Sequence, residues 1–216
     1  MNEFHDIRAV LFDLDGTLLD TREFIFQATE HVLPLFGYPV PPRSAIAKAV
    51  GIPLDDFYRT LVVDAKADIE GIATAHHEFQ KENLGLSVPF PGVLETLERF
   101  HRQGIKLAVV TNRRSGTAVP TLEKAGLLRF LDPVVCADDV VNAKPDAEPV
   151  LLALMKMREV PARAVMVGDS SIDIRAGRNA GTKTVRVTFG FHADDLNDPE
   201  PDAIIQDFKD LLSLIR

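Results

Sequence analysis

Short apolar runs alternate with segments of helical length along most of the chain, and this pattern narrows the possible folds more than any other feature. Strand-like runs occupy residues 8–13, 106–111, 133–137, 164–168, 184–188 and 203–206. Most are almost continuously apolar, which is typical of strands buried on both faces of a sheet. Helical patterns lie between them at 91–104, 115–125, 146–157 and 171–180. The alternation predicts βαβ units, and therefore an α/β fold with a parallel sheet and helices on both faces.

One stretch, from about residue 20 to residue 88, interrupts this alternation. It shows no convincing strand, only helix-like pieces at 21–36, 44–50, 54–67 and 71–84. The run Pro-Phe-Pro-Gly at 89–92 then leads back to the alternating pattern. We therefore predict one domain formed by residues 1–19 and 89–216, and a small helical domain formed by residues 20–88.

Composition excludes several classes of protein. The formal net charge is −8 and no basic block occurs, which argues against a nucleic-acid partner. No apolar run approaches the ~18 residues of a membrane span, so we expect no membrane partner. The N-terminal residues are too polar and acidic for a signal peptide, and the single Cys136 cannot form an internal disulfide. We expect a cytoplasmic enzyme, either a monomer or a homodimer.

Two carboxylates close the first predicted strand, in the sequence LFDLDGT at 11–17. Side chains two residues apart in an extended chain point to the same side, so Asp13 and Asp15 should project together. They would do so at the carboxyl end of a parallel strand, where open α/β sheets bind ligands. Asp-Gly is also a common turn signal. Two carboxylates at a buried strand tip need a cation or a proton to offset their repulsion, which favours a functional site.

Polar residues also follow two later segments. Thr111 is the last residue of the strand at 106–111, and Asn112 follows it. The two residues either cap the next helix or donate to a bound oxyanion. Lys144 precedes Pro145 and a helix start. It is either an ordinary surface residue or a point charge aimed at a phosphate.

A second acid pair, Asp169 and Asp173, lies in the sequence GDSSID at 168–173, between a buried strand and a helix. If the first turn is helical, both carboxylates can address one spot. Capping of the helix is the alternative. An all-oxygen site beside a phosphate predicts Mg²⁺. Because every cluster lies at or just beyond a strand's carboxyl end, we predict that together they form one phosphate-and-metal site.

These motifs resemble, in order and spacing, those of the haloacid dehalogenase-like hydrolase superfamily, most closely its phosphoglycolate-phosphatase-like branch. The resemblance covers essentially the whole chain and rests on Asp13-x-Asp15-Gly16-Thr17, Thr111-Asn112, Lys144-Pro145 and Gly168-Asp169-x-x-x-Asp173. It implies a Rossmann-like catalytic core and makes the insert at 20–88 an α-helical cap domain. Ala147 departs from the Lys-Pro-Asp-Pro run common in that branch.

The resemblance also implies a function, a Mg²⁺-dependent phosphatase acting on a small phosphorylated metabolite through an aspartyl-phosphate on Asp13. Asp15 would be the general acid and base. The implied catalytic residues are Asp13, Asp15, Thr111 and Lys144. The implied substrate-binding residues are Gly16, Thr17, Thr111, Asn112 and Lys144. Arg113 is less usual at its place in the family; we add it as a candidate for substrate binding, although an exposed arginine before a helix is the simpler expectation. The implied metal ligands are Asp13, Asp169, Asp173 and, through its backbone carbonyl, Asp15.

Several alternatives stay open. A β-phosphoglucomutase-type phosphomutase or a pyrophosphatase of the same superfamily would carry the same motifs. A receiver-type phospho-acceptor is disfavoured, because such a domain is shorter and lacks the helical insert. In the insert, Arg43, Lys48 and Arg59 are candidates for substrate contact, although solvated surface is the simpler expectation. The adjacent His76 and His77 would diverge on a helix and make a poor metal pair.

Overall fold

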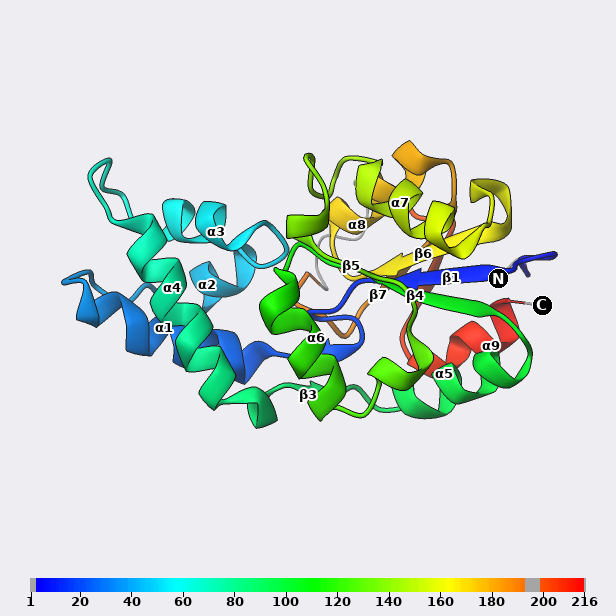
Figure 1. Ribbon diagram of the computed structural model, residues 1–216, viewed down its shortest axis with the longest axis horizontal. Coiled ribbons are helices and arrows are strands. Elements are labelled where there is room, and N and C mark those ends of the chain that lie inside the picture. The colour runs from blue at the N-terminus through cyan, green and yellow to red at the C-terminus, as the bar shows by residue number, and fades with distance from the viewer. Residues whose placement is uncertain (1–2, 193–198, 216) are drawn as a thin grey trace.

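A six-stranded parallel sheet forms the centre of the computed structural model, which describes residues 3–192 and 199–215 (Figure 1). The strand order is β5-β4-β1-β6-β7-β8. The strands are β1 (Ala9–Phe12), β4 (Lys106–Val110), β5 (Val134–Val135), β6 (Ala164–Gly168), β7 (Lys183–Val187) and β8 (Ala203–Ile205). Each predicted strand is present, and the α/β fold with a parallel sheet is confirmed.

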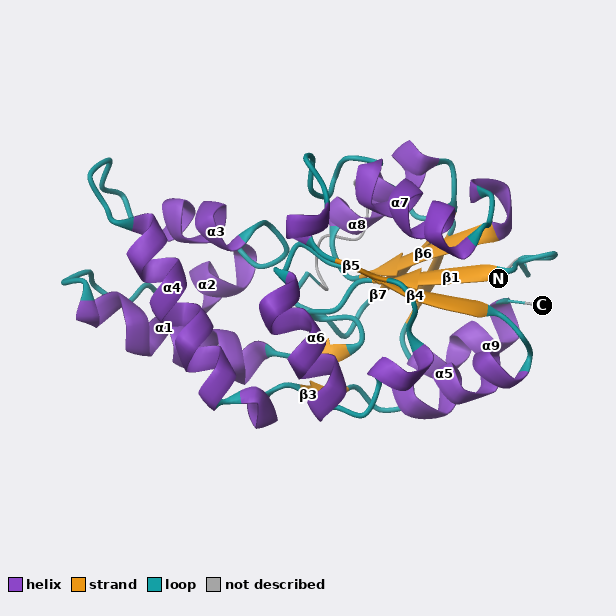
Figure 2. Cartoon of the chain, in the orientation of Figure 1, coloured by secondary structure: helices purple, strands orange, loops and turns teal. Residues whose placement is uncertain are grey.

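Helices cover both faces of this sheet, as Figure 2 shows. The helices α5 (Val93–Arg102), α6 (Ser115–Lys124) and α9 (Leu211–Leu214) pack with one face. The helices α7 (Glu148–Met157) and α8 (Ser171–Ala180) pack with the other. Along β1, Val10 and Phe12 belong to the first hydrophobic cluster, whereas Ala9 and Leu11 belong to the second. The strand is therefore buried on both faces, which explains its continuous apolar sequence.

The insert is helical and has a hydrophobic core of its own. It consists of α1 (Arg22–Leu35), α2 (Arg43–Lys48), α3 (Leu54–Leu61) and α4 (Ile69–Glu82), at the left of Figure 1. Their buried apolar residues, among them Phe24 and Phe57, form a third cluster apart from the two against the sheet. The helix predicted over 54–67 is too long, because α3 ends at Leu61. Asp64 there accepts a hydrogen bond from the backbone of Lys66 at 2.9 Å, in a turn that competes with the helix.

A small two-stranded antiparallel sheet joins the two connections between the insert and the main sheet. It pairs β2 (Leu19–Asp20) with β3 (Val88–Pro89). The sequence analysis found no strand from 20 to 88 and missed this pairing. Strands of two residues are too short to show a period in the sequence. Short 3₁₀ helices occupy Leu84–Leu86, Leu128–Phe130, Ala137–Asp139, Pro161–Arg163 and Phe208–Asp210.

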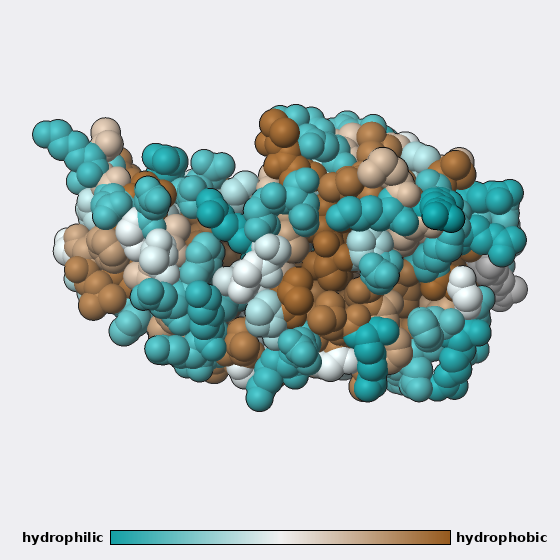
Figure 3. Space-filling view, viewed as in Figure 1, coloured by the Kyte–Doolittle hydropathy of each residue, from teal (hydrophilic) through white to brown (hydrophobic). Residues whose placement is uncertain are grey.

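Polar side chains cover most of the surface seen in Figure 3, and hydrophobic ones gather beside the β5 edge of the sheet, between α6 and α7. Within residues 3–192 and 199–215, no helix has both the length and the apolar character needed to cross a membrane.

Candidate active site

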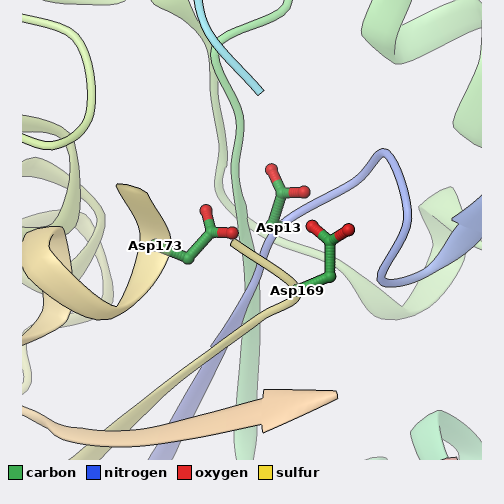
Figure 4. A group of neighbouring side chains, drawn as sticks. All are labelled: Asp13, Asp169 and Asp173. Carbon is green, nitrogen blue, oxygen red and sulfur yellow. The ribbon is translucent and has the colours of Figure 1, made fainter. Parts of the chain in front are cut away.

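Three carboxylates meet at the carboxyl ends of the central strands. Asp13 directly follows β1, Asp169 follows β6, and Asp173 lies in the first turn of α8. Figure 4 shows that they turn toward a common space. One carboxylate oxygen from each lies within 4.8 Å of the others, and all three residues are buried. Two motifs that are far apart in the sequence therefore contribute to one acidic cluster.

Lys144 is the cation of this cluster. Its Nζ donates to Oδ1 of Asp13 at 2.6 Å, to Oδ1 of Asp173 at 2.7 Å and to the carbonyl of Val110 at 2.7 Å. The side chain is only 1% exposed, so Lys144 is not the surface residue that its sequence context allows. Asn112 fixes the backbone at this position, because its side-chain amide accepts from Lys144 N and donates to Lys144 O, both at 3.0 Å.

The electrostatics of the cluster favour a further cation or a proton. Burial, opposed by Lys144 and reinforced by the neighbouring aspartates, raises the pKa of Asp13 well above its ordinary value. Burial and the charge of Asp173 raise the pKa of Asp169 to about 7. Burial alone would lower the pKa of Lys144, but the carboxylates of Asp13 and Asp173 raise it. Three carboxylates against one ammonium leave uncompensated negative charge, and hard carboxylate oxygens are the ligands that suit Mg²⁺.

Two glycines lie against the Asp169 carboxylate, and backbone amides donate to it. The N–H of Phe191 donates to its Oδ2 at 2.6 Å. A methyl group on either Gly16 or Gly190 would overlap the same carboxylate, so only glycine permits this close approach. Gly16 also has a φ of 84°, which favours glycine. Gly190 and Phe191 were missed by the sequence analysis. The only local signal is a glycine shortly after a strand end.

Asp15 lies apart from the three-carboxylate cluster and pairs with Arg113. Nη2 of Arg113 is 3.0 Å from Oδ1 of Asp15, and the two side chains are 11% and 16% exposed. The side chain of Asp15 is therefore not grouped with the residues that could hold a metal. Its predicted contact to a metal runs through the backbone carbonyl and stays a prediction.

A small cavity lies between these strand ends and the helical insert. It measures about 70 Å³, where one water needs roughly 10–15 Å³ by the same measure, so it suits a small ligand. Asp13 belongs to the acidic cluster and also lines the cavity. Thr111 lines it too, and its Oγ1 accepts from Arg113 N at 3.1 Å, which leaves the hydroxyl proton to donate. Thr17 is fully buried, and neither Gly16 nor Thr17 lines the cavity.

The insert contributes polar residues to this cavity through α4. His76, His77 and Gln80 line it, and burial together with Arg113 lowers the pKa of His76 to about 3. The sequence analysis did not predict that these residues of α4 line a ligand cavity. The buried face of α4 begins with Ile69 and Ile72 and continues through the polar His76 and Gln80. Polar residues at buried helical positions are the sequence signal that could have indicated this lining. Arg43 instead pairs with Glu30 at 2.6 Å, and none of Arg43, Lys48 and Arg59 lines the cavity.

Known proteins are similar to this chain in sequence and in fold over nearly its whole length. The family model described as haloacid dehalogenase-like hydrolase matches residues 10–187. Pyrophosphatase PpaX of Halalkalibacterium halodurans is 36% identical and covers 97% of this chain and 97% of its own length. Phosphoglycolate phosphatase of Agrobacterium fabrum is 35% identical over 92% of this chain and 88% of its own. A crystal structure of a predicted phosphoglycolate phosphatase from Haemophilus somnus has a TM-score of 0.90 at 26% identity, covering 96% of this chain and 97% of that one.

Proposed function

The chain belongs to the haloacid dehalogenase-like hydrolases and is a phosphatase of that family, and we propose that it hydrolyses a small phosphorylated metabolite through a phosphoryl group carried on Asp13. The observation that carries the proposal is the buried cluster of Asp13, Asp169 and Asp173 beside Lys144, in which Asp13 also lines a small cavity. The relatives named above are a pyrophosphatase and a phosphoglycolate phosphatase. Both names specify a small, charged substrate.

In the first step, an oxygen of Asp13 attacks phosphorus, and the bond from phosphorus to the leaving oxygen breaks. Lys144 favours the ionised form of Asp13 and fixes its carboxylate through Oδ1. The Thr111 hydroxyl donates to the phosphoryl oxygens as the negative charge on them redistributes. The Lys144 ammonium, whose three N–H groups are taken by Asp13, Asp173 and the carbonyl of Val110, adds positive charge behind Asp13. Asp15, which stands apart from the acidic cluster, gives its proton to the leaving oxygen. In the second step, Asp15 takes a proton from water, the water oxygen bonds to phosphorus, and the Asp13 carboxylate is released.

Mg²⁺ fits the donor set, and Asp13, Asp169 and Asp173 would hold it with the backbone carbonyl of Asp15. When bound, the ion neutralises phosphoryl charge and keeps the carboxylates ionised. Asp173 already accepts from Lys144 through Oδ1 and from the Ser170 hydroxyl through Oδ2, at 2.7 Å each. These two hydrogen bonds fix the orientation of the Asp173 carboxylate.

We further propose that residues 20–88 act as a cap that excludes bulk water from the cavity. Three polar contacts between the insert and the core support a closed arrangement. Asn112 donates to the carbonyl of Gly51 at 2.8 Å, and His192 Nε2 lies 2.9 Å from the carbonyl of Val50. Arg22, the first residue of α1, donates to the carbonyl of Gly190 at 2.7 Å.

A phosphate-release screen tests the proposed function. The panel contains phosphoglycolate, pyrophosphate, a hexose phosphate and a nucleoside monophosphate, each with Mg²⁺ and with a chelator. We expect release from at least one compound with Mg²⁺, its loss to background on chelation, and its return when Mg²⁺ is restored. Absence of phosphate release from every compound contradicts the proposal. An isomerised hexose phosphate with little free phosphate would instead identify a phosphomutase.

Gly190→Ala tests the support of Asp169. The added methyl would overlap the Asp169 carboxylate, so that this ligand must move. We expect the Mg²⁺ concentration for half-maximal activity to rise by roughly 10- to 100-fold, the usual effect of disturbing groups that orient metal ligands. Gly116→Ala is the matched control, because a methyl there meets no atom within 4 Å. An unchanged Mg²⁺ dependence in Gly190→Ala would contradict the role assigned to Asp169.

A further inference from the structure

We propose that Arg113 is a specificity-determining residue that binds a second negative charge on the substrate, one carried by the leaving group. The inference rests on the proposed function and deepens it. It predicts a preference for phosphate compounds whose leaving group bears a carboxylate or phosphate close to the bond that breaks.

The position of the guanidinium is the first support. Nη2 of Arg113 lies 3.0 Å from Oδ1 of Asp15, the group proposed to protonate the leaving oxygen. Asp13 and Arg113 both line the cavity. A phosphoryl group in reach of Asp13 therefore has its leaving oxygen near Asp15, and the rest of the leaving group lies close to Arg113.

Two residues of the insert, Phe24 and Gln80, also contact the Arg113 guanidinium. Its carbon lies 5.3 Å from the centre of the Phe24 ring. With the amide of Gln80 turned so that its oxygen faces the arginine, that oxygen accepts from Nη1 at 2.8 Å. An arginine fixed by an aromatic face and a hydrogen bond loses little further freedom when it binds an anion. Such a planar fork of N–H donors suits a carboxylate or a phosphate.

The distribution of charge around the cavity gives the third support. Among the described residues that line it, the cationic side chains are those of Arg113 and Arg114. Burial lowers the pKa of His76 and of His77, so both are neutral near pH 7. Arg114 is 58% exposed and lies 3.8 Å from Asp55 at the rim. Arg113, whose side chain is 11% exposed, is therefore the cation on the leaving-group side, as the buried Lys144 is beside Asp13.

An anionic leaving group needs this cation. Without it, the extra negative charge would face the Asp13 carboxylate and the phosphoryl group in a small space, where repulsion is strong. A neutral leaving group has no such requirement. The contribution of Arg113 should consequently depend on the substrate, whereas an arginine that only positions Asp15 would affect all substrates alike.

The test compares phosphoglycolate with 2-hydroxyethyl phosphate, which has a neutral hydroxymethyl group in place of the carboxylate. We measure kcat/KM for both with Mg²⁺ in the wild type, Arg113→Gln, Arg113→Lys and Arg129→Gln. The last variant removes an exposed arginine that does not line the cavity and serves as the matched control. Thermal unfolding of each variant checks that it folds.

We expect the wild type to prefer phosphoglycolate and Arg113→Gln to reduce this preference by about 30- to 100-fold. Arg113→Lys should reduce it less, because the ammonium keeps the charge without the planar fork. Arg129→Gln should match the wild type. Equal losses on both compounds in the Arg113 variants, or a wild type without preference, overturn the assignment of Arg113. A wild type inactive on every compound of the screen overturns the proposed function, and this inference with it.

Discussion

Asp13→Asn is expected to lower kcat for phosphate release by about 10⁴-fold or more, because an amide cannot form the aspartyl-phosphate. Asparagine has nearly the same shape as aspartate, so the cavity and the other side chains keep their places. The measurement is phosphate release at saturating Mg²⁺ and substrate, together with the intact mass after a rapid acid quench. Wild-type protein should show the mass of one added phosphoryl group, and Asp13→Asn should not.

The stability of Asp13→Asn separates loss of chemistry from loss of fold. Burial and the neighbouring aspartates raise the pKa of Asp13, which means that the ionised carboxylate is less favourable in the folded chain than in the unfolded one. A neutral amide at position 13 removes this repulsion. We expect the Tm of the metal-free variant to equal or exceed that of the wild type.

Asp64→Asn is the matched control, because Asp64 is exposed and an asparagine there can still accept the hydrogen bond from Lys66. Its activity should equal that of the wild type. If Asp13→Asn retained full activity, the assignment of the nucleophile would be wrong.

The fold could be predicted from sequence because its strands are simple. The strand β1 is buried on both faces between β4 and β6, so its sequence is continuously apolar, and the polar residue Asp13 marks its end. In a parallel sheet the carboxyl ends of the strands share one edge. A motif at a strand end therefore predicts both its local structure and the other strand ends that lie beside it. For this reason Asp13 and Asp169 could be expected to lie close together.

The surroundings of these residues could not be predicted in the same way. The amide of Phe191 donates to Asp169 and Gly190 lies against it, but neither residue differs locally from ordinary turn residues. The partners of Arg113 in the insert are Phe24 of α1 and Gln80 of α4, and they reach it only when the insert packs against the sheet. Contacts of this kind depend on how two hydrophobic cores are oriented, and periodicity within one helix does not contain that information.

Lys144→Met is expected to destabilise the metal-free protein by about 3–5 kcal/mol, the usual result of removing one partner from a buried ion pair. For a chain of this size the decrease in Tm is roughly 6–20 °C. The physical reason is that Nζ donates to Asp13, Asp173 and the carbonyl of Val110, and the side chain is 1% exposed. Methionine fills a similar volume but leaves these acceptors without a donor. The measurement is thermal unfolding in the presence of a chelator, with Lys66→Met, an exposed turn residue, as the control.

The size of this destabilisation should depend on pH in a defined direction. Without the ammonium, the pKa values of Asp13 and Asp169, already raised by burial, rise further, because the charge that opposed the rise is gone. The folded variant then binds more protons than its unfolded chain, so its stability increases as the pH falls. We expect a larger deficit relative to the wild type at pH 8 than at pH 6. We also expect a loss of about 10²- to 10³-fold in kcat at saturating Mg²⁺, because the positive charge that fixes Asp13 beside the phosphoryl group is missing. A Tm deficit that does not change between these two pH values would show that Lys144 contributes packing rather than charge to the acidic cluster.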